Sequence, residues 1–318
     1  MNMGSAVPGA VAVAGAGAVG CHYGAQLLRG GAKVRFLARG AQLQALKRDG
    51  LIHRTGGEER HYRVEAVGTP EALADCSVWL LCCKTTGLAA LLDQIAPFVD
   101  RDALLVTLQN GVRAGEITAG RFPGWAVAVA SAFIGARIER PGVVLHSAAG
   151  HISLARWQGD HPAIGPLLAC WRAAGTEARL VADGRLMLWR KMVWNCGFNA
   201  ICAITRRYAR AVAEDSELAA VAEAAMGELV RVANAQGIAL TGEDVARNMA
   251  VTREMGPVKP SAWQDLERGR PTEVADLNGE VVRSARACGL DAPVNRTLTA
   301  LLLALQRDAA GDVGRPAG

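Results

Sequence analysis

The sequence predicts an α/β domain with a mostly parallel sheet, followed by an all-helical domain. A short apolar strand at residues 10–14 runs directly into a glycine-rich turn and then a helical pattern. Strands of the buried type alternate with amphipathic helices as far as residue 181, which is typical of a parallel sheet covered on both faces. After Asp183 and Gly184 every periodic segment has helical spacing.

The length and composition are those of a two-domain globular protein. The chain has 318 residues, of which 51% are hydrophobic and 20% charged, and this excludes a disordered protein. The net charge of +5 is small and scattered, so we expect no nucleic-acid partner and only mild attraction of anionic small molecules. We expect the first domain at residues 1–182, the helical domain at 183–309 and a disordered tail at 310–318.

The eight cysteines lie mostly in apolar runs and form no C-x-x-C pair. We therefore expect buried free thiols, no disulfide framework, no metal site and a reduced, cytoplasmic setting. The first 28 residues contain no Asp, Glu, Lys or Arg, but they are built from small residues with Pro8 among them. No stretch has the roughly 20 strongly apolar residues of a membrane span, so we expect no membrane partner.

The elements of the first domain follow from hydrophobic period and from glycine or proline punctuation. Two short strands are expected within residues 51–67, around Gly56 and Gly57, and several strands within 125–156, with turns at Pro141–Gly142 and Ala149–Gly150. The other predicted strands are 33–38, 78–83, 103–108 and 177–181. One predicted helix follows the glycine-rich turn and ends at Leu28, and the others are 41–48, 88–98, 115–121 and 163–174.

The second domain is predicted to contain only helices. Gly237, Gly269 and Gly289 fall where helices are expected to end. Thr272 is a candidate cap for the helix that begins there, which would place Glu273 in its first turn, where a carboxylate stabilises the helix dipole. The predicted helices are 185–207, 214–236, 242–255, 261–268, 272–288 and 295–307.

The turn after the first strand has the G-x-G-x-x-G pattern of a dinucleotide-binding site. The first glycine permits the tight turn, the second lets the backbone approach a diphosphate, and the third lets helix and strand pack closely. The alternative is a glycine-rich turn without a ligand. The context favours a Rossmann-type nucleotide-binding domain with cofactor contacts at Gly15, Ala16, Gly17, Ala18, Val19 and Gly20.

Arg39 indicates which dinucleotide is bound. NAD enzymes usually place a carboxylate at the end of the second strand, where it binds the ribose 2′-hydroxyl. Here the strand ends at Arg39, and no carboxylate follows until Asp49. A cation at this position suits a 2′-phosphate, so we predict NADP(H). The alternative is a solvated surface arginine.

Lys191 is the strongest candidate for acid–base chemistry. The chain has only five lysines, and Lys191 lies in a strongly apolar segment. A partly buried lysine can release a proton near neutral pH, whereas an arginine cannot. Asn195 and Asn199 follow at intervals of four, so all three side chains share one helix face, and a polar ligand would satisfy them. The alternatives are a lysine at a helix edge and an interdomain hydrogen-bond network.

Lys84 and Asn110 each follow a predicted buried strand. The carboxyl ends of strands are where open α/β sheets bind their ligands. For Asn110, the alternative is an ordinary turn asparagine before Gly111.

In this order, these residues make the chain resemble the ketopantoate reductase (2-dehydropantoate 2-reductase) family over nearly its whole length. Further markers are Gln109 before Asn110, and the stretch from Ser261 to Thr272, Glu273 and Asn278. The resemblance implies NADPH-dependent reduction of a 2-oxo acid to a 2-hydroxy acid. With ketopantoate as substrate, this is the step to pantoate in pantothenate biosynthesis.

The resemblance also implies roles for individual residues. Lys191 is the general acid and Glu273 orients the substrate and the lysine. Asn110 bridges cofactor and substrate. Substrate contacts are implied for Asn195, Asn199 and Ser261, and further cofactor contacts for Lys84 and Ala136.

Two positions depart from the family pattern. Val258 and Ala209 stand where well-studied members have asparagines, which weakens the prediction of ketopantoate more than that of 2-oxo-acid reduction. Two other functions stay open: a 3-hydroxyacid, 6-phosphogluconate or glycerol-3-phosphate type dehydrogenase, and a non-catalytic NADP(H) sensor. Exposed apolar helices in the second domain would allow a homodimer.

Overall fold

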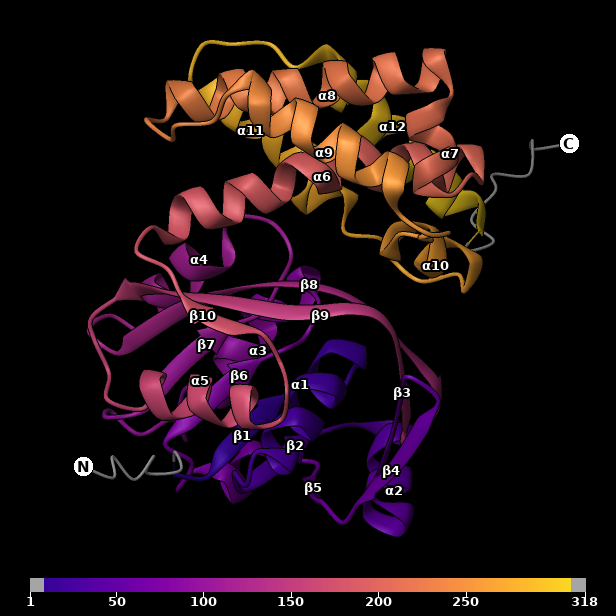
Figure 1. Cartoon of the computed structure of the whole chain (residues 1–318). Coiled ribbons are helices and arrows are strands. Elements are labelled where there is room, and N and C mark those ends of the chain that lie inside the picture. Colours follow the sequence, from indigo (N-terminus) through magenta and orange to yellow (C-terminus); the bar gives the residue numbers. More distant parts are fainter. Residues whose placement is uncertain (1–8, 310–318) are drawn as a thin grey trace, which may run out of the picture. The chain divides into compact units, whose positions relative to one another are not determined.

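The computed structural model describes residues 9–309, and the tail predicted at 310–318 lies outside the described residues (Figure 1). The chain divides into two compact units. Unit 1 contains the chain up to Gln109 and Arg113–Gly184, and unit 2 contains Asn110–Val112 and the chain from Arg185 onward. The short Asn110–Val112 segment therefore belongs with the helices rather than with the sheet that precedes it.

Unit 1 is built on one ten-stranded sheet in the order β4-β3-β9-β8-β7-β6-β1-β2-β5, with β10 paired to β9. The central strands from β8 to β5 run parallel, which confirms the predicted mostly parallel sheet. Residues 51–67 contain the two predicted strands, β3 and β4, and also a third strand, β5, which pairs with β2. The strands are β1 Val11–Ala14, β2 Val34–Leu37, β3 Leu51–Thr55, β4 Glu58–Tyr62, β5 Glu65–Val67, β6 Val78–Leu81, β7 Leu104–Thr107, β8 Ala126–Arg140, β9 Val143–Gln158 and β10 Ala178–Leu180.

Helices cover both faces of this sheet (Figure 1). Alternate residues of β1 point to opposite faces, so Val13 packs into the core with α1 and α5, while Ala12 packs into the core with α3 and α4. The helices of unit 1 are α1 Ala18–Arg29, α2 Gly40–Asp49, α3 Leu88–Ile95, α4 Ala114–Arg121 and α5 Ile164–Ala173, with 3₁₀ turns η1 Pro70–Leu73 and η2 Thr85–Gly87.

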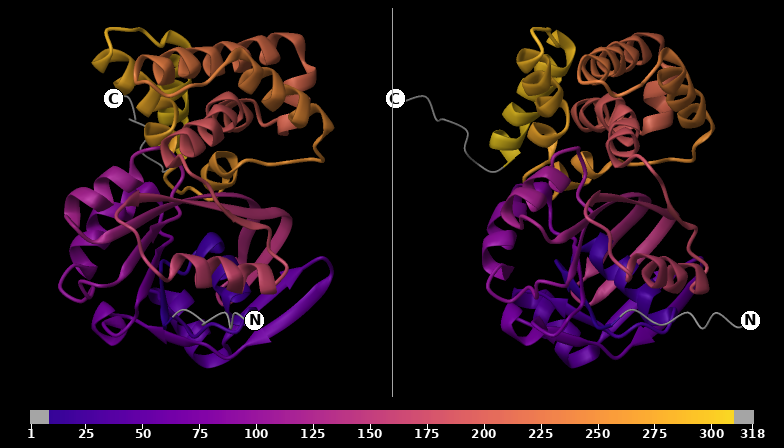
Figure 2. Two further views of the ribbon diagram at one scale, coloured as in Figure 1. Left: turned by 60° about the vertical axis from the view of Figure 1, so that its left-hand side comes forward. Right: turned by 90° about the vertical axis from the view of Figure 1, so that its left-hand side faces the viewer.

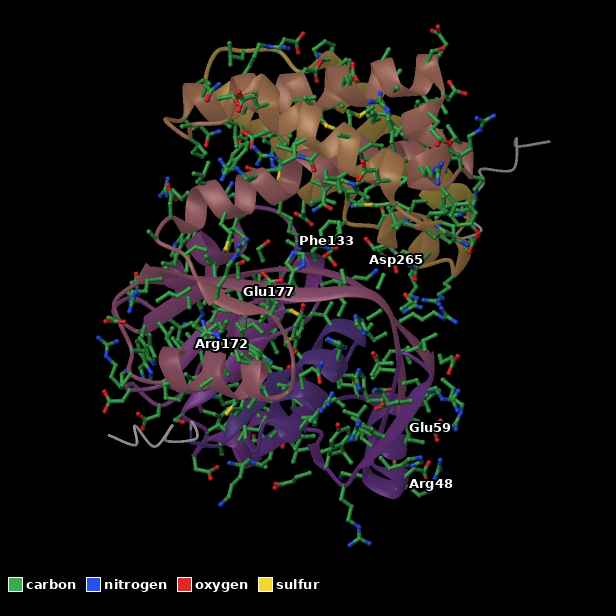
Figure 3. All side chains as sticks on the ribbon, in the orientation of Figure 1. Arg48, Glu59, Phe133, Arg172, Glu177 and Asp265 are labelled. Atoms are coloured by element: carbon green, nitrogen blue, oxygen red, sulfur yellow. The ribbon has the colours of Figure 1, made fainter. Side chains whose placement is uncertain are left out.

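The turn predicted at Ala149–Gly150 is wrong. Strands β8 and β9 form one long antiparallel hairpin, connected at the predicted Pro141–Gly142 turn. Ala149 and Gly150 lie inside β9 with φ of 54° and 112°, and the pairing shifts register opposite Phe133. Left-handed residues here make an irregularity in the ladder, which bends a strand without ending it. Phe133, labelled in Figure 3, stacks on a histidine of β9 at 5.8 Å between ring centroids.

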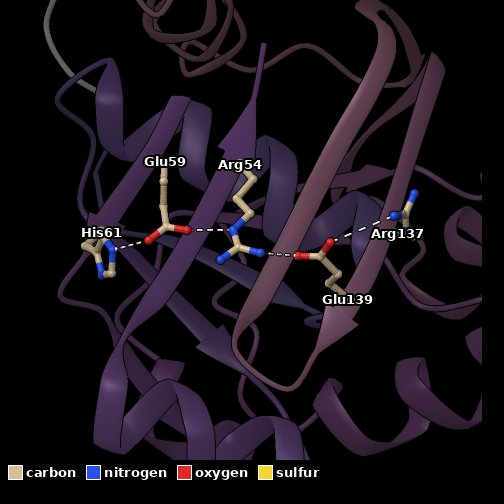
Figure 4. A network of polar contacts seen from close by, with 5 residues as sticks. All are labelled: Arg54, Glu59, His61, Arg137 and Glu139. Atoms are coloured by element: carbon tan, nitrogen blue, oxygen red, sulfur yellow. Dashed lines mark hydrogen bonds and ion pairs between the residues drawn. The ribbon is translucent and has the colours of Figure 1, made fainter. Parts of the chain in front are cut away.

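The outer part of the sheet carries a row of alternating charges (Figure 4). Arg54 of β3 lies at its centre and pairs with Glu59 of β4 and with Glu139 of β8, both at 2.6 Å. His61 and Arg137 extend the row at either end. These side chains are largely exposed, so each pair contributes little to stability. Charges beside the edge strand β4 oppose its pairing with a strand of another molecule.

Unit 2 is helical, and its helices lie side by side in both views of Figure 2. Side chains that cap the backbone set two helix starts: Asp215 accepts from Glu217 and Leu218 N–H, and Thr241 forms a capping box with Asp244. The helices are α6 Gly184–Thr205, α7 Ala209–Glu214, α8 Ser216–Ala235, α9 Gly242–Glu254, α10 Ser261–Glu267, α11 Asn278–Ala287 and α12 Pro293–Ala309, with a 3₁₀ turn η3 Val274–Asp276.

The helix predicted at 272–288 is broken, and Thr272 does not cap it. Its backbone N–H and hydroxyl both donate to Gln306 Oε1, at 2.8 and 2.9 Å. Helix α11 begins only at Asn278, whose buried side chain donates to the carbonyl of Cys196 and to Asn295 Oδ1. Because these tertiary hydrogen bonds occupy the polar side chains, the segment before Asn278 forms one 3₁₀ turn instead of a regular helix start.

All eight cysteines are free, as expected from the sequence. Within residues 9–309, no helix combines the length and the apolar character that a membrane crossing requires.

Candidate active site

The glycine turn in unit 1 has the backbone geometry that a diphosphate requires. Gly15 has φ of 114°, and a Cβ there would lie 2.6 Å from the backbone nitrogen of Cys83. A Cβ on Gly20 would lie 2.2 Å from the Gly15 oxygen. At Gly17 the space is open, so the first N–H groups of α1 can be approached. No acidic residue lies in the first turn of α1, which leaves the positive end of the helix dipole unopposed.

Arg39 is the N-cap residue of α2 and is exposed. Among the described residues its guanidinium has no hydrogen-bond or ion-pair partner. The other arginine of this region, Arg35, is already occupied, because it pairs with Asp75 at 2.6 Å and donates to the Ala72 carbonyl at 2.8 Å. An anionic ligand could therefore contact Arg39, whereas Arg35 is already paired.

Two further predicted cofactor residues also lie in unit 1. Lys84 follows β6 and forms the N-cap of η2, where its carbonyl accepts from Gly87 N–H at 2.9 Å. Ala136 lies on β8 next to a register shift, opposite His146 of β9. Both side chains are partly buried.

Unit 2 brings together three predicted residues that are far apart in the chain. Lys191 Nζ donates to Asn110 Oδ1 at 2.9 Å, and Asn110 Nδ2 donates to Glu273 Oε2 at 2.9 Å. The two contacts fix the amide orientation, because only its oxygen can accept from an ammonium and only its nitrogen can donate to a carboxylate. The Asn110 amide thus bridges an acid and a base.

Close packing around Gly111 explains why Asn110 reaches Glu273. Gly111 has φ of 85°, and a Cβ there would lie 2.9 Å from the backbone oxygen of Asp276. The two segments can therefore approach only where a side chain is missing. Gln306 holds Thr272, the residue directly before Glu273. The Glu273 carbonyl accepts from the N–H of Asp276 at 3.0 Å.

Burial changes the proton affinity of Lys191. Loss of water lowers its pKa to about 8, and the negative charge of Glu273 opposes this effect. The ammonium is therefore the main form near neutral pH, yet it can release its proton. Burial also raises the pKa of Asp276; Arg283 opposes this effect, and Glu273 and Glu280 add to it.

Asn195 and Asn199 lie on α6, one and two turns after Lys191, and are 6% and 3% exposed. Asn195 Nδ2 has no hydrogen-bond partner among the described residues. A buried donor without a partner costs about 1–3 kcal/mol, which a ligand oxygen would recover. The predicted face of polar residues on one helix is thus present.

The remaining predicted substrate position lies on a different helix. Ser261 is exposed at the first residue of α10. The two departures from the family pattern lie next to each other, because Ala209 N–H donates to the Val258 carbonyl at 3.1 Å. This place therefore contains two apolar side chains, of which Ala209 is buried and Val258 partly buried.

Sequence reasoning did not foresee the structural roles of two glutamines, Gln306 and Gln109. Gln306 anchors Thr272 from 34 positions away, and no local pattern identifies it. Gln109 is buried and donates to carbonyls of the β6 segment, but in the sequence it is only the neighbour of Asn110.

Comparison with known proteins identifies the family. The family model "Ketopantoate reductase PanE/ApbA" matches residues 11–159, and its C-terminal counterpart matches residues 183–306. A 2-dehydropantoate 2-reductase of Halobacterium salinarum is 31% identical over 301 residues, covering 94% of this chain and 99% of the relative. One of Mesorhizobium japonicum is 30% identical and covers 93% and 98%.

Solved structures agree. A PanE/ApbA family ketopantoate reductase of Ralstonia eutropha has a TM-score of 0.88 and 31% identity, covering 94% of this chain and 99% of its own. A D-mandelate dehydrogenase with NADH and anilino(oxo)acetate has a TM-score of 0.87 at 24% identity, over 94% and 99%, and shares the fold. The chain is therefore an oxidoreductase that belongs to the ketopantoate reductase family.

Proposed function

We propose that this protein reduces a 2-oxo acid to a 2-hydroxy acid with NADPH, and that this acid is ketopantoate. The observation that carries the proposal is the hydrogen-bonded series Lys191–Asn110–Glu273, with a lysine whose pKa lies near 8. The names of the relatives support the same substrate.

Carbonyl reduction needs a proton donor beside the ketone oxygen. A bound nicotinamide dinucleotide would supply the hydride. Lys191 stabilises the negative charge that develops on the oxygen and then donates a proton from Nζ to it. Asn110 directs the ammonium through its Oδ1, and Glu273 holds the Asn110 amide in that orientation. General acid catalysis of this kind is worth about 10²–10⁴-fold.

The substrate carboxylate and hydroxyl are assigned to the polar side chains near the lysine. Asn195 Nδ2 is an unsatisfied buried donor and suits an oxygen of the substrate. Asn199 extends the same face of α6, and Ser261 offers a hydroxyl at the start of α10.

The cofactor is assigned to unit 1 and the substrate to unit 2. Residues 1–182 would form the NADP-binding domain and residues 183–309 the substrate domain. The open backbone at Gly17 and the bare N-terminus of α1 fit a diphosphate, and the exposed Arg39 favours a 2′-phosphate over a 2′-hydroxyl. Lys84 and Ala136 are assigned to the remaining contacts with the cofactor.

The test is a steady-state assay of NADPH and NADH oxidation with a panel of carbonyl acids. The panel contains ketopantoate, branched 2-oxo acids without a hydroxyl, a 3-oxo acid and dihydroxyacetone phosphate. We expect turnover of 2-oxo acids with NADPH at a higher kcat/KM than with NADH. Turnover restricted to the 3-oxo acid or the phosphorylated ketone would contradict the proposal, as would tight NADPH binding without turnover of any carbonyl.

A further inference from the structure

Gln109 has an unusual hydrogen-bonding arrangement for a buried glutamine. It lies in the chain directly after Leu108, and its side chain is 4% exposed. Its Nε2 donates to the Leu81 carbonyl at 2.9 Å and to the Cys83 carbonyl at 3.1 Å. Its Oε1 is buried and has no partner among the described residues. Since both neighbours are acceptors, the nitrogen must face them, and the donor end makes the contacts.

The two carbonyls belong to the segment that packs against the glycine turn. Leu81 ends β6, and Cys83 directly precedes Lys84. A Cβ added at Gly15 would meet the backbone nitrogen of Cys83 at 2.6 Å, so this backbone forms one wall of the turn. On its other side, the same segment is held by Gln109.

A methionine or leucine at position 109 would avoid burying the unpartnered Oε1, and an unpartnered buried acceptor normally costs stability. The amide is nevertheless present, and its donor end bridges the carbonyl ends of β6 and the following loop. The Gln109 amide thereby holds the Leu81–Lys84 segment against the end of β7. Because that segment packs against Gly15, the amide also helps to hold the wall of the glycine turn in place.

We infer that Gln109 is a positioning residue for the dinucleotide site, acting through the Leu81–Lys84 segment. The inference rests on the proposed function, because it requires that the cofactor binds at the Gly15–Gly20 turn. Loss of the Nε2 donor releases the Cys83 carbonyl, and the wall of the turn and Lys84 then shift together. Cofactor affinity falls as a result, while the proton donor in unit 2 keeps its own contacts.

The chain offers a matched control in Gln158. Its Nε2 also donates to two backbone carbonyls, those of Phe122 at 3.0 Å and Trp125 at 2.9 Å. Gln158 pairs with Val127 near the start of β8. It therefore lies at the amino end of the parallel strands, whereas Gln109 lies at their carboxyl end.

The experiment compares Gln109→Met with Gln158→Met in the full-length protein. NADPH binding is measured directly by cofactor fluorescence without substrate, and thermal unfolding is recorded for each variant. Each variant loses two hydrogen bonds to backbone carbonyls, and Gln109→Met also removes the unpartnered Oε1, so we expect its Tm to decrease no more than that of Gln158→Met. We expect NADPH affinity to fall about tenfold in Gln109→Met and to stay within about twofold in Gln158→Met. At saturating NADPH, kcat of Gln109→Met should stay near that of the wild type.

A second variant, Gln109→Glu, keeps the shape and replaces the donor by an acceptor once its carboxyl is ionised, so at alkaline pH it should weaken NADPH binding at least as much. Wild-type affinity in both Gln109 variants, or equal weakening in Gln109→Met and Gln158→Met, would overturn the inference alone. Failure of the wild-type protein to bind either dinucleotide would overturn the proposed function and the inference together.

Discussion

Each unit contains buried basic side chains, but the two places differ in what surrounds the basic nitrogen. In unit 2, Lys191 is partly buried and is linked through Asn110 to a carboxylate. In unit 1, His22 Nδ1 and His53 Nε2 lie 3.0 Å apart, and the ring of His146 lies 4.4 Å from that of His22.

Burial lowers the pKa of Lys191 and of the two buried histidines, but to different effect. It lowers the pKa of His22 to about 2 and of His53 to about 4, and the neighbouring histidines add to the shift. For Lys191, Glu273 opposes the effect of burial and leaves the pKa at about 8. A buried base therefore becomes a neutral packing group when only other bases surround it, and a usable proton donor when a carboxylate is near.

The largest effect is expected from removing the lysine. Lys191→Ala should lower kcat by about 10²–10⁴-fold, since the proposed general acid is lost, with little change in NADPH affinity. The measurement is steady-state kinetics beside a binding titration. Lys47→Ala, at an exposed position on α2, is the control and should keep wild-type turnover. A Lys191→Ala enzyme with near-normal kcat would refute the role of this residue.

The role of the carboxylate in this contrast can be tested with Glu273→Gln. The wild-type rate should fall as pH rises through about 8, because the donor must be protonated. Without the charge of Glu273 the lysine pKa decreases, so the fall in rate should begin at lower pH. If the lysine pKa decreases by about 1, the variant should be about tenfold less active than the wild type on the alkaline side. The measurement is kcat against pH. An unchanged profile would mean that Glu273 has no electrostatic effect on the lysine.

The histidine cluster should make unit 1 sensitive to acid. The pKa of His53 is about 4 in the folded protein and near 6.5 when unfolded, so the unfolded chain binds more protons between these values. Stability is complete above pH 6.5 and decreases as pH falls toward 4. His53→Gln removes the titrating group and should reduce this loss by about 1–3 kcal/mol.

Denaturant unfolding of His53→Gln at pH 7 and pH 5 measures that loss. His61→Gln, on the exposed strand β4, is the control and should behave as the wild type. Parallel stability curves for His53→Gln and the wild type would contradict the assignment.

The smallest effect is expected at Arg39, which is exposed rather than buried. Arg39→Ala should raise KM for NADPH by about tenfold and leave KM for NADH almost unchanged, because only the 2′-phosphate would need the cation. The ratio of the two kcat/KM values measures this preference. Equal losses with both cofactors would show that Arg39 does not select between them.

Several predicted features are local and could be found from the sequence. Each of these features depends on residues that are close in the sequence. They are the glycine turn, the periodicity of the single strands and helices, and the spacing of Lys191, Asn195 and Asn199. The prediction at Thr272 failed because a distant partner, Gln306, occupies its hydroxyl. The turn predicted at Ala149–Gly150 failed because the opposite strand absorbs the irregularity.

The sequence alone indicated the fold class, the resemblance to the family and the proposed proton donor, because the motifs behind them depend on residue type and on spacing within short segments. Only the tertiary structure decided that Asn110 lies between Lys191 and Glu273, 81 and 163 positions away from them. It also decided that His22 and His53 are buried against each other, with the partly exposed His146 beside them. Proton affinity depends on the water and charges within a few ångströms, and those neighbours exist only once the chain has folded.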